Sequence, residues 1–130
     1  MERISPSIRA QRILVVEDEP TTRQALCQLL HSSGYACAGA AHGAEALELA
    51  ETFQPQAIIM DLMMPVLDGF ETTRRLKADR ATHAIPVLAL TSSVTDEDRH
   101  QAARAGVDDF LAKPVDLPEL LCHLHEQLAR

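Results

Sequence analysis

Clustered basic residues are scarce in this chain of 130 residues, which carries 12 Lys and Arg against 19 Asp and Glu, for a formal net charge of −7. A surface that binds nucleic-acid phosphates needs Lys and Arg gathered on one face. The only close group here is Arg74, Arg75 and Lys77, which we expect on a solvated helix face. The composition therefore argues against direct binding of nucleic acid by this chain.

Cysteine and histidine pairs at the spacing of a zinc site are also lacking. The three cysteines, Cys27, Cys37 and Cys122, are odd in number and widely spaced, with no C-x-x-C motif. A structural zinc site needs paired ligands at short spacing. His123 and His125 are two residues apart, so on a helix they point in different directions, and we expect both to be solvated. The cysteines are expected to be reduced thiols, as in a cytosolic protein.

Long apolar runs are missing as well. No segment approaches the length of a membrane span, and residues 1–10 lack the apolar stretch of a signal peptide. We therefore predict a cytoplasmic protein with no membrane partner. Residues 1–10 are expected to form a flexible lead-in, and residues 11–130 a single folded domain.

What the sequence does have is a series of short apolar runs. Four of them resemble buried strands, at residues 13–16, 57–60, 86–90 and 110–112, and a weaker fifth lies at residues 35–41. None alternates cleanly between apolar and polar residues, which is typical of strands covered on both faces. The runs therefore predict a buried, parallel sheet.

Helical spacing of apolar residues follows each run, in segments that begin near Pro20, Ala46, Phe70, Thr95 and Leu117. Strand and helix thus alternate five times, which predicts a parallel sheet with helices on both faces. We expect a flavodoxin-like (βα)5 domain with strand order 2-1-3-4-5. In such sheets ligands bind at the carboxyl ends of the strands, near the first and third.

The segment at residues 95–105 differs from the other helices. Thr95, with Asp98 three residues later, resembles a helix cap, and Asp116 is expected to cap the last helix. The helix that Thr95 opens has little besides alanine to bury, so we expect it to be loosely held.

Polar residues end the apolar runs at the predicted rim of the sheet. They are Glu17, Asp18 and Glu19 after the first run, Asp61 after the third, Thr91 after the fourth and Lys113 after the fifth. Carboxylates gathered at one rim repel each other unless a cation lies between them. Oxygen ligands of this kind suit Mg²⁺, with Mn²⁺ as an alternative. With Mg²⁺ bound, three carboxylates and one lysine would sum to zero charge, which suits an anionic substrate.

These residue types are those that phosphoryl transfer needs. A carboxylate such as Asp61 can act as a nucleophile toward phosphorus and form an acyl phosphate. The metal ion and Lys113 would stabilise charge on the transferring oxygens, and the Thr91 hydroxyl could bond to one of them.

Four motifs resemble those of bacterial two-component response-regulator receiver domains. They are ILVVEDEP at 13–20, MDLMMP at 60–65 with DG at 68–69, LTS at 90–92 and KP at 113–114. The motifs occur in the family's order, and the resemblance covers residues 12–130, nearly all of the chain. Glu17 departs from the pattern, since the family most often has Asp there.

The resemblance implies a role for each matching residue. Asp61 is the phosphoacceptor. Mg²⁺ is held by Glu17, Asp18, Asp61 and the backbone carbonyl of Met63. Glu17 binds the ion directly or through water.

The remaining roles concern the phosphoryl group and the switch. Lys113 contacts the phosphoryl group, and Pro114 follows a cis peptide bond. Thr91 and Phe110 are the switch residues, while Met63 and Ser93 flank the entry and tune the rate of hydrolysis.

The implied function is that of a signalling switch and not of a turnover enzyme. A histidine kinase or histidine phosphotransfer protein would phosphorylate Asp61. The surface formed by residues 95–105, the fifth strand and the last helix would then change its preference for an effector or output domain. A dimer through the same surface is also compatible with the family.

Two other functions remain open at this point. One is a pseudo-receiver that binds partners without phosphorylation. The other is a phosphatase with an Asp nucleophile, which wants a second Asp two residues later as general acid; position 63 is Met, which disfavours it.

Overall fold

The computed structural model describes residues 10–64, 68–92 and 95–129 of the chain. Five strands and five helices alternate within these ranges, and none of these helices is long and apolar enough to span a membrane. Their bounds are β1 Arg12–Val16, α1 Pro20–Ser32, β2 Ala36–Ala40, α2 Gly43–Thr52, β3 Ala57–Asp61, α3 Gly69–Ala78, β4 Val87–Thr91, α4 Asp96–Ala105, β5 Asp109–Ala112 and α5 Leu117–Leu128. The expected lead-in lies outside the described residues except for Ala10, so it stays a prediction.

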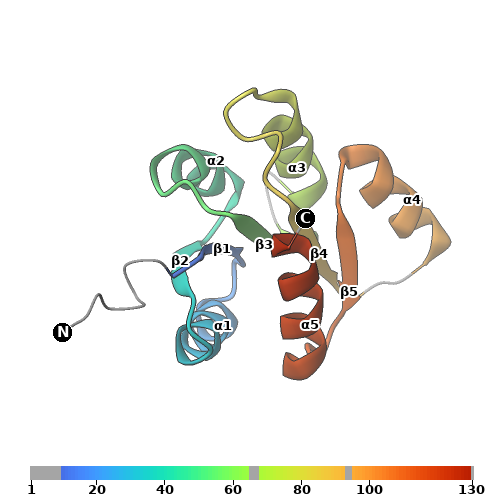
Figure 1. Cartoon of the computed structure of the whole chain (residues 1–130). Helices are drawn as coiled ribbons and strands as arrows, with labels where there is room; N and C mark the ends of the chain where they lie inside the picture. The colour runs from blue at the N-terminus through green and yellow to red at the C-terminus, as the bar shows by residue number, and fades with distance from the viewer. Residues whose placement is uncertain (1–9, 65–67, 93–94, 130) are drawn as a thin grey trace.

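The strands form one parallel sheet in the order β2-β1-β3-β4-β5, which confirms the predicted flavodoxin-like topology. Helices cover both faces, with α1 and α5 on one side and α2, α3 and α4 on the other (Figure 1). Because β1 lies between β2 and β3, the chain reverses its direction of travel across the sheet after β2. The carboxyl ends of β1 and β3 therefore lie side by side at the switch point.

Each face of the sheet has its own apolar core. In β1, Ile13 and Val15 pack against α1 and α5, whereas Leu14 and Val16 pack on the opposite face against α2 and its neighbours. All residues of β3 and β4 are buried. Burial on both faces explains why the strands read as continuous apolar runs and not as alternating ones.

Two strands extend one residue further than expected, so that Asp61 ends β3 and Thr91 ends β4. In the ladder Asp61 lies opposite Leu90, and Thr91 lies opposite Ala112. The backbones of both polar residues are thus fixed by the sheet, and their side chains begin from defined positions at its rim.

The helix α4 buries few of its residues, so we still expect it to be loosely held. Thr95 caps it by accepting a hydrogen bond from the Asp98 N–H over 3.1 Å, and among its residues only Ala102 and Ala105 are buried. Each small side chain contributes little apolar area, so little free energy holds this helix against the sheet. At the start of α5, Asp116 occupies the cap position but its side chain makes no capping hydrogen bond.

His123 corrects the expectation of a solvated histidine. Its Nδ1 lies 2.7 Å from Oδ2 of Asp109, which joins α5 to β5. The hydrogen bond to Asp109 raises the pKa of His123, and the carboxylates of Glu119 and Glu126 add to the effect. The His123 imidazole therefore binds its proton more tightly in the folded chain than in the unfolded one.

This ion pair predicts a pH-dependent contribution to stability. Because the folded-state pKa of His123 is raised, the contribution is complete below the unfolded pKa and is lost as the pH rises through the folded value. The substitution His123→Gln should therefore lower the free energy of unfolding near pH 5.5, by up to about 1 kcal/mol. Near pH 8.5 the same substitution should lower it by a smaller amount. Urea unfolding at both pH values measures this, with exposed His125→Gln as the control. A difference that is equal or larger at the higher pH would contradict the assignment.

Gly69 sits where the chain after β3 passes close to the start of α3. A Cβ atom at this position would contact the Asp61 carbonyl oxygen and lie 2.6 Å from the Leu62 Cα, both of which are backbone atoms. The Gly69 N–H also donates to the Leu62 carbonyl oxygen over 3.2 Å. Only glycine fits without displacing the segment that carries Asp61.

The close approach predicts that Gly69→Ala destabilises the fold by about 1–3 kcal/mol, because backbone must move to accept the added methyl group. Gly39→Ala is the matched control, since a Cβ there would contact the flexible Arg23 side chain, with Cδ and Cγ 3.0 Å away. Urea unfolding of both variants should give the larger loss at Gly69. Equal losses would contradict the account.

Candidate functional site

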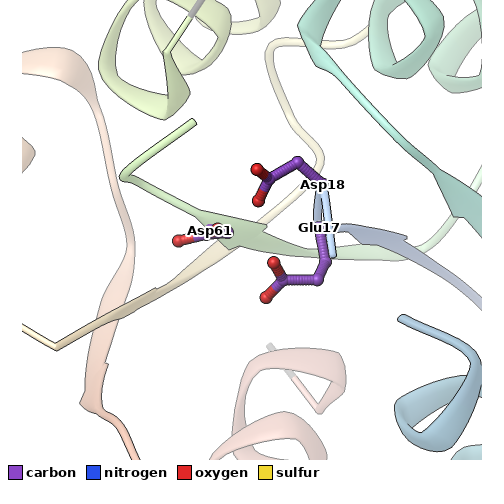
Figure 2. Close-up of side chains that lie close together, drawn as sticks. All are labelled: Glu17, Asp18 and Asp61. Carbon is purple, nitrogen blue, oxygen red and sulfur yellow. The ribbon is translucent and has the colours of Figure 1, made fainter. Parts of the chain in front are cut away.

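Three carboxylates gather at the carboxyl ends of β1 and β3. Glu17 and Asp18 follow β1 directly, Asp61 ends β3, and one oxygen atom from each lies within 4.8 Å of the others. Figure 2 shows these three side chains at the ends of the two strands. Glu17 and Asp61 are each only 3% exposed, whereas Asp18 is exposed. The site therefore combines two buried carboxylates with one that faces solvent.

Lys113, which follows the edge strand β5, brings a positive charge to this cluster. Its Nζ lies 3.1 Å from Glu17 Oε1 and 3.5 Å from Asp61 Oδ1. Partial burial alone would lower the pKa of Lys113, but the hydrogen bond to Glu17 and the charges of Asp61 and Glu17 outweigh it and raise that pKa. Lys113 is thus held as an ammonium ion between the two buried carboxylates.

The pKa of Glu17 is raised, first by burial and further by the charge of Asp61. Hydrogen bonds from the Glu19 N–H, over 3.2 Å, and from Lys113 partly offset the rise. With all groups ionised, three carboxylates and one ammonium leave a formal charge of −2. A hard divalent cation with oxygen ligands matches both this charge and this donor set.

The other predicted rim residues lie at the same edge. Thr91 is buried at the end of β4, and its carbonyl oxygen accepts a hydrogen bond from the Lys113 N–H over 2.8 Å. The Met63 N–H donates to Asp61 Oδ1 over 3.1 Å, which keeps the Met63 backbone beside Asp61, while its side chain is 59% exposed. The peptide bond between Lys113 and Pro114 is cis, as expected.

Phe110 is not part of this rim cluster. Phe110 lies in β5 and is partly buried, with the guanidinium carbon of Arg99 from α4 5.1 Å from its ring centroid. Ser93 lies outside the described residues, so its place stays a prediction. The structure therefore brings together Glu17, Asp18, Asp61, Thr91, Lys113 and the Met63 backbone.

Arg23 supports the site and was missed from the sequence, as was the role of Glu19 as a helix cap. Arg23 Nη1 donates to the Glu17 carbonyl oxygen over 2.8 Å. The Glu19 side chain caps α1 by accepting from the Thr22 N–H over 2.8 Å. The acidic residue before Pro20 was a usable signal for the cap. Nothing local signalled the reach of Arg23.

Comparison with known proteins agrees with this geometry. The chain matches the family model described as "Response regulator receiver domain" over residues 13–125. It is 38% identical to Protein PilH of Pseudomonas aeruginosa over 118 residues, which covers 91% of this chain and 98% of PilH. It is 40% identical to the Response regulator MprA of a Mycobacterium strain, but spans only 51% of that longer protein.

Among solved structures, the receiver domain of the sensor histidine kinase PA1611 from Pseudomonas aeruginosa is similar, with a TM-score of 0.86 and 36% identity. The match covers 93% of this chain and 99% of that domain, whose structure holds a magnesium ion coordinated in the active-site cleft. The family match covers most of the chain, and the fold and rim residues agree with it. The chain belongs to the response regulator receiver domain family.

Proposed function

We propose that the chain is the phosphoacceptor of a two-component phosphorelay and that Asp61 takes up the phosphoryl group. The observation that carries the proposal is the cluster of three carboxylates within 4.8 Å, with the Lys113 ammonium 3.1 Å from one and 3.5 Å from another. The donor is a histidine kinase or a histidine phosphotransfer protein. The transfer forms an aspartyl phosphate on Asp61. This group stays on the chain as the signal, whereas a turnover enzyme would release its product.

The residues at the rim fit a magnesium ion. Glu17, Asp18, Asp61 and the backbone carbonyl of Met63 supply oxygen donors only, which Mg²⁺ prefers, and Mn²⁺ is the alternative ion. The formal charge of −2 at the cluster gives a divalent cation an electrostatic reason to bind. When bound, the ion neutralises charge on the transferring phosphoryl oxygens.

In this transfer the protein mainly positions the reacting groups and neutralises charge on the phosphoryl oxygens. A carboxylate oxygen of Asp61 attacks the phosphorus, the bond between phosphorus and the donor's imidazole nitrogen breaks, and the imidazole leaves. The Lys113 ammonium and the Thr91 hydroxyl stabilise the phosphoryl oxygens. Water later attacks the phosphorus and releases phosphate and the Asp61 carboxylate, at a rate that Met63 and Ser93 tune.

The signal leaves through the surface of α4, β5 and α5. Phosphorylation adds about one negative charge and strong acceptor oxygens, which draw the Thr91 hydroxyl toward them. Phe110 then moves and repacks against α4. In the present structure the Arg99 guanidinium of α4 lies over the Phe110 ring. Because α4 buries little, a small bias can shift its position and so change the affinity for an effector, an output domain or a second copy of the chain.

The first test is phosphorylation with acetyl phosphate and Mg²⁺. The wild-type chain should gain one phosphoryl group by intact-mass spectrometry, and Asp61→Asn should gain none because the nucleophilic oxygen is lost. Asp116→Asn, which changes an exposed carboxylate with no capping hydrogen bond, should be labelled like the wild type. Undiminished labelling of Asp61→Asn would sink the assignment. A folded wild type that stays unlabelled would favour the pseudo-receiver.

The second test separates the metal ion from the nucleophile. Asp18→Asn should weaken Mg²⁺ binding roughly tenfold or more because it removes an exposed oxygen donor and one negative charge. In thermal unfolding, MgCl₂ should raise the Tm of the wild type, since a ligand that binds only the folded state stabilises it. The rise should be smaller for Asp18→Asn, and the variant without Mg²⁺ should be no less stable than the wild type, because repulsion within the cluster is relieved. An unchanged response to Mg²⁺ in this variant would rule out Asp18 as a ligand.

A further inference from the structure

Two of the three cysteines meet in the folded chain, although ten positions separate them. Cys27 lies on α1 and Cys37 lies on β2, and their sulfur atoms are 2.7 Å apart. A disulfide bond has a sulfur–sulfur distance of about 2.0 Å, so less than about 1 Å of approach would close one. Cys122 is exposed on α5, which packs on the same face of the sheet as α1.

The fold holds this pair in place. Cys27 and Cys37 both pack against the apolar cluster that includes Ile13 and Leu30, and Cys37 lies opposite Ile13 in the ladder between β1 and β2. Both cysteines keep intermediate exposure, so a small reagent can reach them. β2 is an edge strand of the sheet, and α1 packs directly against it.

The two thiols differ in reactivity. The hydrogen bond that Cys37 donates to Cys27 lowers the pKa of Cys27, and the Arg23 guanidinium one helical turn earlier lowers it further. The same hydrogen bond raises the pKa of Cys37, and burial adds to this rise. Cys27 is therefore the thiolate that attacks first, since the thiolate is the nucleophilic form.

We propose that Cys27 and Cys37 form a reversible intramolecular disulfide that ties α1 to the edge strand β2, with a low-molecular-weight disulfide as the oxidant. The Cys27 thiolate attacks one sulfur of the oxidant, whose S–S bond breaks, and one thiolate leaves. Cys37 then loses its proton, and its sulfur attacks Cys27 Sγ. The mixed S–S bond breaks, and the second thiol leaves. Two protein thiols are thus oxidised by two electrons, and one small disulfide is reduced to two thiols.

The inference does not depend on phosphoryl transfer, because neither sulfur belongs to the carboxylate cluster. The hydrogen-bonded pair and the cluster can therefore be tested independently.

The test uses the full chain carrying Cys122→Ser, which removes the exposed thiol, in a buffer of oxidised and reduced glutathione. Intact-mass spectrometry should show the loss of two hydrogen atoms, and peptide mapping should show residues 27 and 37 joined. In this background Cys37→Ser should instead accumulate a glutathione adduct at Cys27. Cys27→Ser should react more slowly, because burial still raises the pKa of the remaining Cys37 thiol, whereas the Arg23 charge lowers the pKa of Cys27.

A second measurement asks whether the fold itself favours the bond. The glutathione ratio at half-oxidation should show that the disulfide forms roughly tenfold or more favourably in the native chain than in concentrated guanidinium chloride, because the native structure already holds the sulfurs together. An equal tendency in both conditions would overturn the proposal. Native Cys122→Ser protein that keeps two free thiols in oxidised glutathione would also overturn it.

Discussion

The ion pair between Lys113 and Glu17 connects the two ends of the chain, and the rim of the sheet depends on it. The residues are 96 positions apart, yet Nζ and Oε1 lie within 3.1 Å. Burial and the neighbouring charge of Asp61 both disfavour the ionised form of Glu17, and Lys113 counteracts them. A buried charge that loses its partner is strongly destabilising, so Lys113 stabilises the buried Glu17 carboxylate that it contacts. Lys113 thus offsets the repulsion between the carboxylates, and it reaches them only once β5 has joined the sheet.

The convergence of these residues could be predicted because it follows from backbone topology. Parallel strands end at one rim, so polar residues that follow apolar runs must meet there once the strand order is known. Residue types then restrict the chemistry. The extra residue at the ends of β3 and β4 could not be predicted, because a buried polar residue ends an apolar run in the sequence whether or not its backbone still pairs.

Contacts between side chains of different elements could not be predicted. They depend on how a helix is rotated about its axis against the sheet, and no local pattern fixes this. Spacing along the chain was even misleading, since it made the cysteines look dispersed and one histidine look solvated. Contacts missed in this way include Arg23 with Glu17, Cys27 with Cys37, Asp109 with His123, and Arg99 with Phe110.

A difference in anchoring between the rim and α4 makes the proposed switch physically reasonable. With Mg²⁺ bound, the cluster sums to zero formal charge, and conversion of Asp61 to its phosphate adds about one negative charge. One added charge beside a bound cation is a modest bias on any structural equilibrium. It can act on α4, which buries only Ala102 and Ala105, far more readily than on β3 and β4, which are buried throughout. The strands therefore hold the chemistry in register, while the weakly packed helix is the part of the fold whose free energy such a small bias can change.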